Sequence, residues 1–180
     1  MSENRKLNME ELGRMNPVEF KSSEKTPLVF FLDNVRSMNN VGSVFRSADA
    51  FRLEEIRLTG ITPQPPHREI QKTALGATET VQWVYSEDAL VALQGFKAQG
   101  YTIICAEQVA NSKLLSEAVF IREKKYVVVL GNEVDGVRQE LIDIADYCVE
   151  IPQAGTKHSL NIAVAAGIVA WEVYRQTTKT

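Results

Sequence analysis

The chain has 180 residues, a formal net charge of −3 and a hydrophobic content of 44%, which suits one globular domain with a sizeable core. Its longest apolar runs, LVFFL and YVVVL, are far too short to cross a bilayer. The first 15 residues are polar and contain no signal-peptide hydrophobic run, so we expect a cytoplasmic protein.

The cysteines and histidines do not form a recognisable site in the sequence. Cys105 and Cys148 each lie in a predicted strand, and the chain contains no CxxC pair. We expect two buried free thiols in a reducing compartment. His67 and His158 stand apart from other ligand residues, so no metal site is predicted.

Charge is unevenly distributed along the chain. Residues 34–72 contain six Lys and Arg against four Asp and Glu, whereas residues 131–150 contain Arg138 against six acids. This distribution fits a basic patch on the first segment, and it equally fits a mixed, solvated surface.

Strands and helices are predicted to alternate from Pro27 onward, after a polar N-terminal extension of residues 1–26 with at most two short helices. Ser86 has the chemistry of a helix N-cap, and Gly100 suits a helix end. The predicted strands are 27–33, 55–60, 80–85, 101–106, 125–133 and 146–152. The predicted helices are 39–52, one that follows Pro66, 86–99, 114–118, 137–145 and 159–176, and the last is apolar enough to be buried on nearly all sides.

The strands are continuous runs of Val, Ile and Leu, which indicates a parallel sheet covered on both faces, an open α/β fold. Ligands of such sheets bind beyond the carboxyl ends of the strands. The loops that could hold a site therefore follow Asp33, Leu130 and Ile151, with the loop after Cys105 as a fourth.

The first of these loops leads into the segment NNVGSVFRSADAF, residues 39–51. Asn40 can cap a helix and Gly42 permits close approach of another backbone. Arg46 is placed beside apolar neighbours, where an unpaired guanidinium would be costly, so it either pairs with an acid or serves an anionic ligand such as phosphate.

The other two loops are also rich in glycine and polar residues. In VVVLGNEVDGV a buried strand ends at Gly131 and is followed by Asn132 and Glu133. This reads as an ordinary polar turn or as a loop that offers backbone N–H groups to a ligand. In the segment 150–172 a strand ends at Ile151 and a capped helix follows, with Ser159 and Asn161 either capping it or facing a ligand.

Taken in this order, the three loops resemble the three motifs of the SpoU family of RNA ribose 2′-O-methyltransferases, within the SPOUT class. The matching segments are NNVGSVFRSADAF, VVVLGNEVDGV and IPQAGTKHSLNIAVAAGIVAWE, with a shorter match, KTALGAT, between the first two. The likeness extends from about Pro27 to Thr178. Each motif alone is weak, but three in one order at compatible spacing are specific.

The resemblance implies an RNA (ribose-2′-O)-methyltransferase that uses S-adenosyl-L-methionine. It implies an open, mostly parallel sheet whose C-terminal part is threaded into a deep trefoil knot, with the second and third loops around the cofactor. It also implies a homodimer in which Arg46 faces the neighbour's cofactor. Residues 1–26 would be an extension and residues 27–180 the methyltransferase domain.

The resemblance also assigns residues to the site, and Glu133 keeps a structural alternative in which it pairs with Arg46 or braces the knot. Catalytic positions fall on Asn40, Arg46, Glu133, Ser159 and Asn161. Cofactor contacts, largely from backbone, fall on Ala106, Gly131, Asn132, Ile151, Ser159 and Leu160. Basic side chains expected to bind RNA are Arg36, Arg46, Arg52, Arg68 and Lys72.

Two departures from the family pattern bear on these expectations. The first motif often ends in Phe-Gly, whereas Phe51 is followed here by Arg52. The 26 leading residues are too few for the added substrate-binding domain of some members, which favours transfer RNA over ribosomal RNA as substrate.

For Arg46 we expect a role in binding phosphate and stabilising the developing alkoxide, with the family's proposal of a general base as the alternative.

Three other functions are compatible with parts of the sequence. A knotted RNA-binding module without chemistry would not need the intact set of motif residues. A SPOUT methyltransferase acting on a base is disfavoured by the Ser-Leu-Asn signature of residues 159–161. A nucleotide-dependent oxidoreductase is disfavoured because the chain contains no GxGxxG fingerprint.

Overall fold

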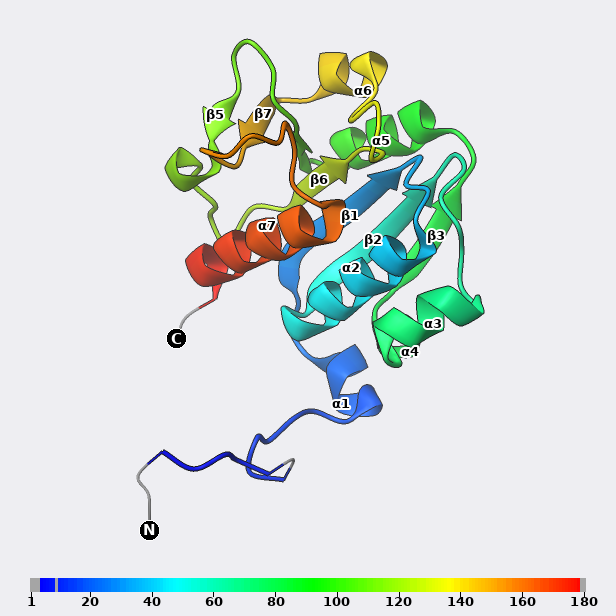
Figure 1. The fold of residues 1–180 in the computed structure, drawn as a ribbon, viewed down its shortest axis with the longest axis vertical. Coiled ribbons are helices and arrows are strands. Elements are labelled where there is room, and N and C mark those ends of the chain that lie inside the picture. The colour runs from blue at the N-terminus through cyan, green and yellow to red at the C-terminus, as the bar shows by residue number, and fades with distance from the viewer. Residues whose placement is uncertain (1–3, 9, 179–180) are drawn as a thin grey trace.

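The computed structural model describes residues 4–8 and 10–178, and it is built around one seven-stranded sheet with helices on both faces (Figure 1). The strand order is β3-β2-β1-β6-β4-β7-β5, and every neighbouring pair is parallel. The open α/β fold predicted from the sequence is confirmed. The strands are β1 (Thr26–Asp33), β2 (Leu53–Thr59), β3 (Trp83–Ser86), β4 (Thr102–Ala106), β5 (Lys113–Leu114), β6 (Tyr126–Leu130) and β7 (Tyr147–Glu150).

The helices lie in two layers, with α2 and α7 on one face of the sheet and α5 and α6 on the other (Figure 1). A short helix, α1, precedes the sheet and buries Phe20 in the core. The helices are α1 (Pro17–Ser22), α2 (Met38–Ala50), α3 (Arg68–Ala74), α4 (Ala77–Thr80), α5 (Ala89–Ala98), a 3-10 turn η1 (Leu115–Glu117), α6 (Gln139–Ile144) and α7 (Ile162–Thr177).

Strand β1 shows why the strands read as unbroken apolar runs. Leu28, Phe30 and Leu32 pack toward α2 and α7, while Val29 and Phe31 pack toward α5 and α6. All five are at most 1% exposed. A strand covered on both faces has no solvent-facing side on which a polar residue would be favourable.

The predicted free thiols are confirmed. Cys105 of β4 and Cys148 of β7 are buried, lie opposite each other in the register and form no disulfide. Burial raises the pKa of both thiols, so each is held as the neutral form and behaves as a small apolar side chain.

The starts of three helices differ from prediction. Ser37, not Asn40, caps α2, because its side chain accepts the backbone N–H of Asn40 at 3.2 Å. Asp88, not Ser86, caps α5. The last helix begins at Ile162 rather than Ser159, which leaves the Ser-Leu pair of the third motif in the loop before it.

The expectation that α7 is buried on nearly all sides is wrong. Val164, Ile168 and Trp171 are 51%, 38% and 51% exposed. Their spacing of four and three residues places them on one face of the helix. The opposite face, which carries Ala166, Val169 and Val173, is fully buried. No helix among the described residues is long and apolar enough to span a membrane.

Gly42 sets the distance between α2 and α3. A Cβ atom at this position would lie 2.1 Å from Thr73 Oγ1 and 2.3 Å from the carbonyl oxygen of Ile70. The second of these atoms belongs to the backbone and cannot move aside without shifting α3. The close approach that the sequence suggested for Gly42 is therefore confirmed.

We expect Gly42→Ala to destabilise the protein by about 1–3 kcal/mol, the usual cost of forcing an extra methyl group into a packed interface. The matched control is Gly95→Ala in the middle of α5, where no atom lies within 4 Å of the added Cβ. That change should stabilise the protein by about 0.5–1 kcal/mol, since alanine is the better helix former. Urea unfolding of both variants measures the difference, and equal effects would refute the close-contact interpretation.

Candidate functional site

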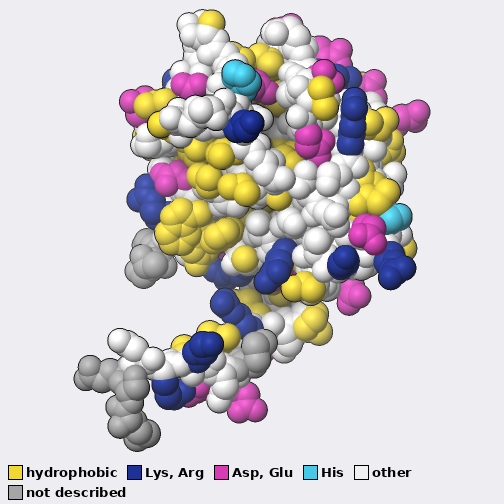
Figure 2. Space-filling view, viewed as in Figure 1, with side chains coloured by type: hydrophobic (Ala, Val, Ile, Leu, Met, Phe, Trp, Pro, Cys, Tyr) yellow, Lys and Arg dark blue, Asp and Glu magenta, His cyan; other side chains and the backbone are white. Residues whose placement is uncertain are grey.

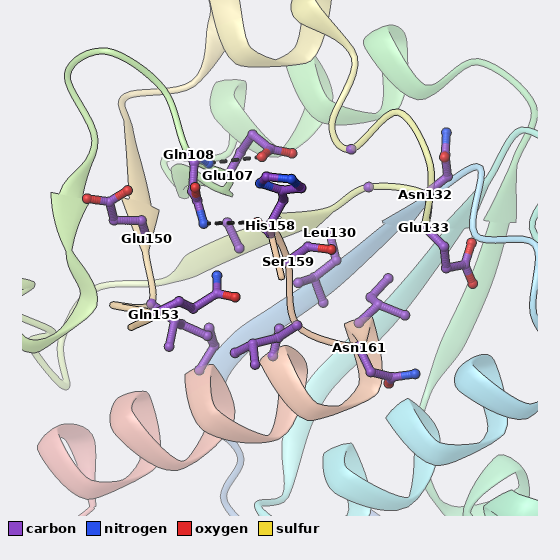
Figure 3. A pocket seen from close by; sticks show the side chains of 18 of the residues that line it. Glu107, Gln108, Leu130, Asn132, Glu133, Glu150, Gln153, His158, Ser159 and Asn161 are labelled. Atoms are coloured by element: carbon purple, nitrogen blue, oxygen red, sulfur yellow. Dashed lines mark hydrogen bonds between the residues drawn. The ribbon is translucent and has the colours of Figure 1, made fainter. Parts of the chain in front are cut away.

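A pocket of about 510 Å³ opens at the carboxyl ends of β4, β6 and β7 (Figure 3). This is the edge where open α/β sheets bind ligands, and the volume suits a small molecule, for which about 300–1,000 Å³ is typical. Its apolar surface is formed by Leu130, Val149, Ile151, Ile162, Ala165 and Val169. Its polar groups include Glu107, Gln108, Asn132, Glu133, Glu150, Gln153, His158, Ser159 and Asn161.

The pocket brings together most of the residues that the sequence assigned to a site. Three of the expected catalytic residues, Glu133, Ser159 and Asn161, lie in its wall. Asn40 and Arg46 do not belong to the lining. All six expected cofactor contacts also line it: Ala106, Gly131, Asn132, Ile151, Ser159 and Leu160.

The loop after β6 folds back on itself. Asn132 and Gly136 exchange two backbone hydrogen bonds of 3.1 Å, and the Asn132 side chain accepts the N–H groups of Val134 and Asp135. A Cβ at Gly131 would lie 2.1 Å from the backbone of Gly136, so only glycine fits there. The tight loop leaves the Gly131 backbone at the pocket wall.

The loop after β4 joins this loop to the third one, and sequence reasoning missed the residues that do so. Glu107 accepts the N–H of Val137 at 2.9 Å, just beyond the glycine loop. Gln108 donates its side-chain amide to the carbonyl of His158 at 3.4 Å (Figure 3). The only sequence signal was their position directly after a buried strand.

A chain of side-chain hydrogen bonds connects the second loop to the first helix and the last. Asn40 Nδ2 donates to Glu133 Oε1 at 3.0 Å, and Asn161 Nδ2 donates to Asn40 Oδ1 at 3.1 Å. Asn161 also caps α7 by accepting the N–H of Ala163. The three polar motif residues therefore form one network at the start of α2 and α7.

Glu133 also binds the backbone that leads into α2. Its carboxylate accepts the N–H groups of Arg36 at 3.1 Å and Ser37 at 3.2 Å. Partial burial alone would raise the pKa of Glu133, but the hydrogen bonds from Asn40 and from these backbone groups outweigh it and hold the pKa below its usual range. Among the described residues Glu133 forms no ion pair with Arg46, and its hydrogen bonds hold the loop after β6 against the start of α2.

An ion pair between a partly exposed arginine and a buried carboxylate anchors the far end of the same loop. Asp33, fully buried at the end of β1, accepts two hydrogen bonds of 2.8 Å from the guanidinium of Arg138. Thr59 donates a third at 2.9 Å. The hydrogen bonds with Asp33 raise the pKa of Arg138. The two partners are 105 residues apart, and nothing in the local sequence predicted the pair.

Arg46 lies on the surface and not among apolar neighbours. It is exposed on α2, and its side chain forms no hydrogen bond or ion pair within residues 4–8 and 10–178. The expected apolar surroundings of Arg46 are therefore wrong, and of its two predicted roles the pairing with an acid is not seen among these residues, whereas the binding of an anionic ligand stays a prediction. It lies six residues, or about 9 Å along the helix axis, beyond Asn40, which places it outside the pocket of its own chain.

The other basic candidates are spread over the surface. Arg36 lies beside the pocket loop, 3.9 Å from Asp135. Arg68 and Lys72 are exposed on α3. Arg52 lies at the start of β2, at the opposite edge of the sheet from the pocket. The structure thus brings Arg36 to the site and leaves Arg52 far from it.

The electrostatic character of the pocket is acidic. Within the described chain, its lining holds four carboxylates and no Lys or Arg. Such a lining favours a ligand with positive charge. No group of three His, Cys, Asp or Glu in the described residues could hold a metal ion. The four carboxylates belong to Glu107, Glu133, Asp135 and Glu150.

Comparison with known proteins agrees with the resemblance to the SpoU family. The family model described as the SpoU rRNA Methylase family matches residues 27–171. A tRNA (guanosine(18)-2′-O)-methyltransferase of Aquifex aeolicus is 32% identical over 168 residues, covering 88% of this chain and 74% of that protein. A 23S rRNA (guanosine-2′-O-)-methyltransferase, RlmB, of Vibrio vulnificus is 30% identical, covering 84% of this chain and 60% of that protein.

A solved structure agrees in fold. The AdoMet-bound rRNA methyltransferase from Sinorhizobium meliloti superposes with a TM-score of 0.79 at 28% identity, over 92% of this chain and 62% of that one. The chain therefore spans less than two thirds of two of these three relatives.

Glu133 gives the site a testable dependence on pH. Because its pKa is lowered in the folded state, its stabilising effect is fully present above the unfolded-state pKa of about 4.3 and is lost as the pH falls through the folded value. We expect Glu133→Gln to lower the free energy of unfolding by about 1 kcal/mol at neutral pH. The expected loss is small because the side chain is exposed and solvent screens its charge.

The measurement is urea unfolding of wild type and variant at pH 7 and again below pH 4.3. The difference between the two proteins should shrink in acid. Glu123→Gln, an exposed loop carboxylate, serves as the control and should differ little from wild type at either pH. A difference that is constant with pH would refute a role for the charge of Glu133.

Proposed function

This chain belongs to the SpoU rRNA methylase family, and we propose that it transfers a methyl group from S-adenosyl-L-methionine to the 2′-hydroxyl of a ribose in structured RNA. The observation that carries the proposal is the pocket formed by the loops after β4, β6 and β7, which include the second and third motifs, with the first-motif residue Asn40 hydrogen-bonded to Glu133 and Asn161 at its edge. Residues 27–180 would form the methyltransferase domain and residues 1–26 an extension.

The pocket fits the methyl donor in shape and charge. Its apolar surface suits the adenine ring, and the backbone at Gly131, Ile151 and Leu160 lies at the wall, where it can bind the polar edges of the base and ribose. The four carboxylates complement the sulfonium and ammonium charges. Asn132 and Ser159 would add side-chain contacts, and Ala106 would close the end near β4. The trefoil knot, which concerns the threading of this region, stays a prediction.

The chemistry requires alignment more than activation of the leaving group. When bound, the cofactor supplies a methyl group on a positively charged sulfur, ready for displacement. The protein must bring the 2′-oxygen into line with that methyl group and stabilise the negative charge that develops as the hydroxyl proton leaves. Asn40, Ser159 and Asn161 would orient the ribose and the loop, with Glu133 holding Asn40 in place.

Arg46 would supply the positive charge. A guanidinium scarcely loses its proton in proteins, so we assign it to the phosphate beside the target ribose and to the developing alkoxide rather than to proton abstraction. Because it is exposed and lies outside the pocket of its own chain, we propose that it acts in the pocket of a second subunit.

A homodimer would make this arrangement possible. The exposed face of α7 formed by Val164, Ile168 and Trp171 is an apolar surface of the kind that marks protein interfaces. Figure 2 shows hydrophobic side chains gathered over α7. Helix α7 packs beside α2, where a Cβ added at Gly167 would lie 3.8 Å from Ser47 Oγ. A subunit bound to this face would cover α7 and would therefore lie close to α2, the helix that carries Arg46.

Transfer RNA is the substrate that we favour. The Aquifex aeolicus relative acts on tRNA and is covered over 74% of its length, more than the Vibrio vulnificus rRNA enzyme at 60%. Arg36, Arg68 and Lys72 would contact the RNA backbone on the side of the pocket and α3. Structured RNA is recognised largely by shape and by its 2′-hydroxyl groups. A tRNA substrate and two reduced thiols fit a cytoplasmic enzyme.

Methyl transfer to RNA is the direct test. The purified protein is incubated with labelled S-adenosyl-L-methionine and with unfractionated tRNA or ribosomal RNA, and the product is digested to nucleosides. We expect label in a 2′-O-methylnucleoside. Label on a base instead would contradict the ribose assignment.

We expect Arg46→Ala to lower methyl transfer at least ~100-fold, the usual effect of removing a positioned electrostatic donor. Cofactor affinity, measured by calorimetry, should not change. Arg46→Lys retains the charge and should recover part of the rate. Lys124→Ala, an exposed loop cation, is the control for the loss of one charge and should be near normal. Near-normal turnover of Arg46→Ala would exclude the proposed role.

We expect Ile168→Asp to convert the dimer to a monomer and to abolish methyl transfer, because a charge would be buried in an apolar interface. Sedimentation equilibrium measures the mass. The control is Val91→Asp, which places the same charge on an exposed apolar position of α5. A wild-type protein that sediments as a monomer would rule out the subunit arrangement.

A further inference from the structure

A second cavity lies at the edge of the sheet opposite the pocket. It has a volume of about 260 Å³ and is found where β1 and β2 begin and α7 ends. Three cationic side chains line it against one carboxylate. We call it the amino-edge hollow, and its lining residues are Glu24, Lys25, Thr26, Pro27, Arg52, Arg122, Thr177 and Thr178.

The one carboxylate does not balance the three cations. Arg122 pairs with Glu24 at 2.7 Å. Lys25 is bound to the carbonyl of Phe20 and lies over its ring. The guanidinium of Arg52 has no hydrogen bond or ion pair within the described part of the chain. Burial, and then the positive charge of Arg52, lower the pKa of Lys25, and the carboxylate of Asp49, which lies outside the lining, opposes this only in part. The hollow therefore carries excess positive charge that an anion would relieve.

The backbone at Arg52 is the second observation. Its φ angle is +50°, a left-handed conformation that is relaxed for glycine and strained for other residues. The backbone contacts at this position, from Thr26 N–H to its carbonyl and from its N–H to Asp49, would be kept by glycine. What arginine adds is the side chain in the hollow, and strain retained at such a position points to a function for it.

We propose that the amino-edge hollow binds a backbone phosphate of the RNA substrate, at a point remote from the methylated ribose. The inference rests on the proposed function, since it presumes that RNA is the substrate. The two edges of the sheet are separated by the eight residues of β1, about 25 Å. A mononucleotide cannot bridge that distance, whereas a folded RNA can. Figure 2 shows Lys and Arg side chains where the N-terminal segment leaves the body.

The experiment compares wild type, Arg52→Gly and Arg122→Gln for binding of unfractionated tRNA over a series of salt concentrations. We expect each variant to bind tRNA about five- to tenfold more weakly. The slope of log affinity against log salt concentration should fall by about one, since about one counterion fewer is released. Arg52→Gly should not lower the melting temperature, because glycine relieves the backbone. Affinity for S-adenosyl-L-methionine should be unchanged. Lys97→Gln, which removes an exposed cation from α5, is the control.

Each alternative outcome overturns the proposal. Unchanged tRNA affinity and salt dependence in both variants would do so, as would a wild type that does not bind tRNA. Inorganic phosphate is titrated in parallel: if it binds in a saturable way that Arg52→Gly abolishes while tRNA binding is unaffected, the hollow is a site for free phosphate. Failure here leaves the proposed function standing if the wild type binds the methyl donor and methylates RNA.

Discussion

The hydrogen bonds between Glu133, Asn40 and Asn161 are the contacts on which the rest of the site depends. They connect the loop after β6 to the N-termini of α2 and α7, two helix ends that both carry partial positive charge. The carboxylate of Glu133 offsets that charge and satisfies backbone N–H groups that precede α2. Without it, two helix ends of like polarity would lie side by side with nothing between them.

This network explains why residues from three distant segments can form one pocket. The loop after β6 is held at one end by Glu133 and at the other by Arg138, whose partner Asp33 is fully buried. Glu107 fixes the turn between these points from the side of β4. A loop tied at three places presents its backbone groups in one arrangement, which is what binding with little loss of entropy requires.

Unbroken apolar strands and glycine-rich loops are local signals, and they predicted the open α/β sheet and the loops that form the pocket. The individual pocket residues were assigned through the resemblance to the SpoU motifs. The sequence could not choose Ser37 over Asn40 as the cap of α2, since both have cap chemistry within one turn. It missed Arg138, which pairs across 105 residues. It predicted that α7 is buried on nearly all sides, because an apolar pattern does not tell whether the covering surface belongs to this chain or to another one.

The exposed face of α7 and the exposed Arg46 are best understood together. An apolar face costs free energy in water, and a guanidinium on the next helix without a partner contributes nothing to folding. A second subunit packed on α7 would bury the apolar face. It would also bring Arg46 to an anionic target in the pocket of that subunit. The pocket of one chain contains the carboxylates and amides of the site but not Arg46, so under the proposed arrangement a single chain would lack the cation that the reaction requires. The active site would be a property of the dimer, and the fold of each chain would supply only its parts.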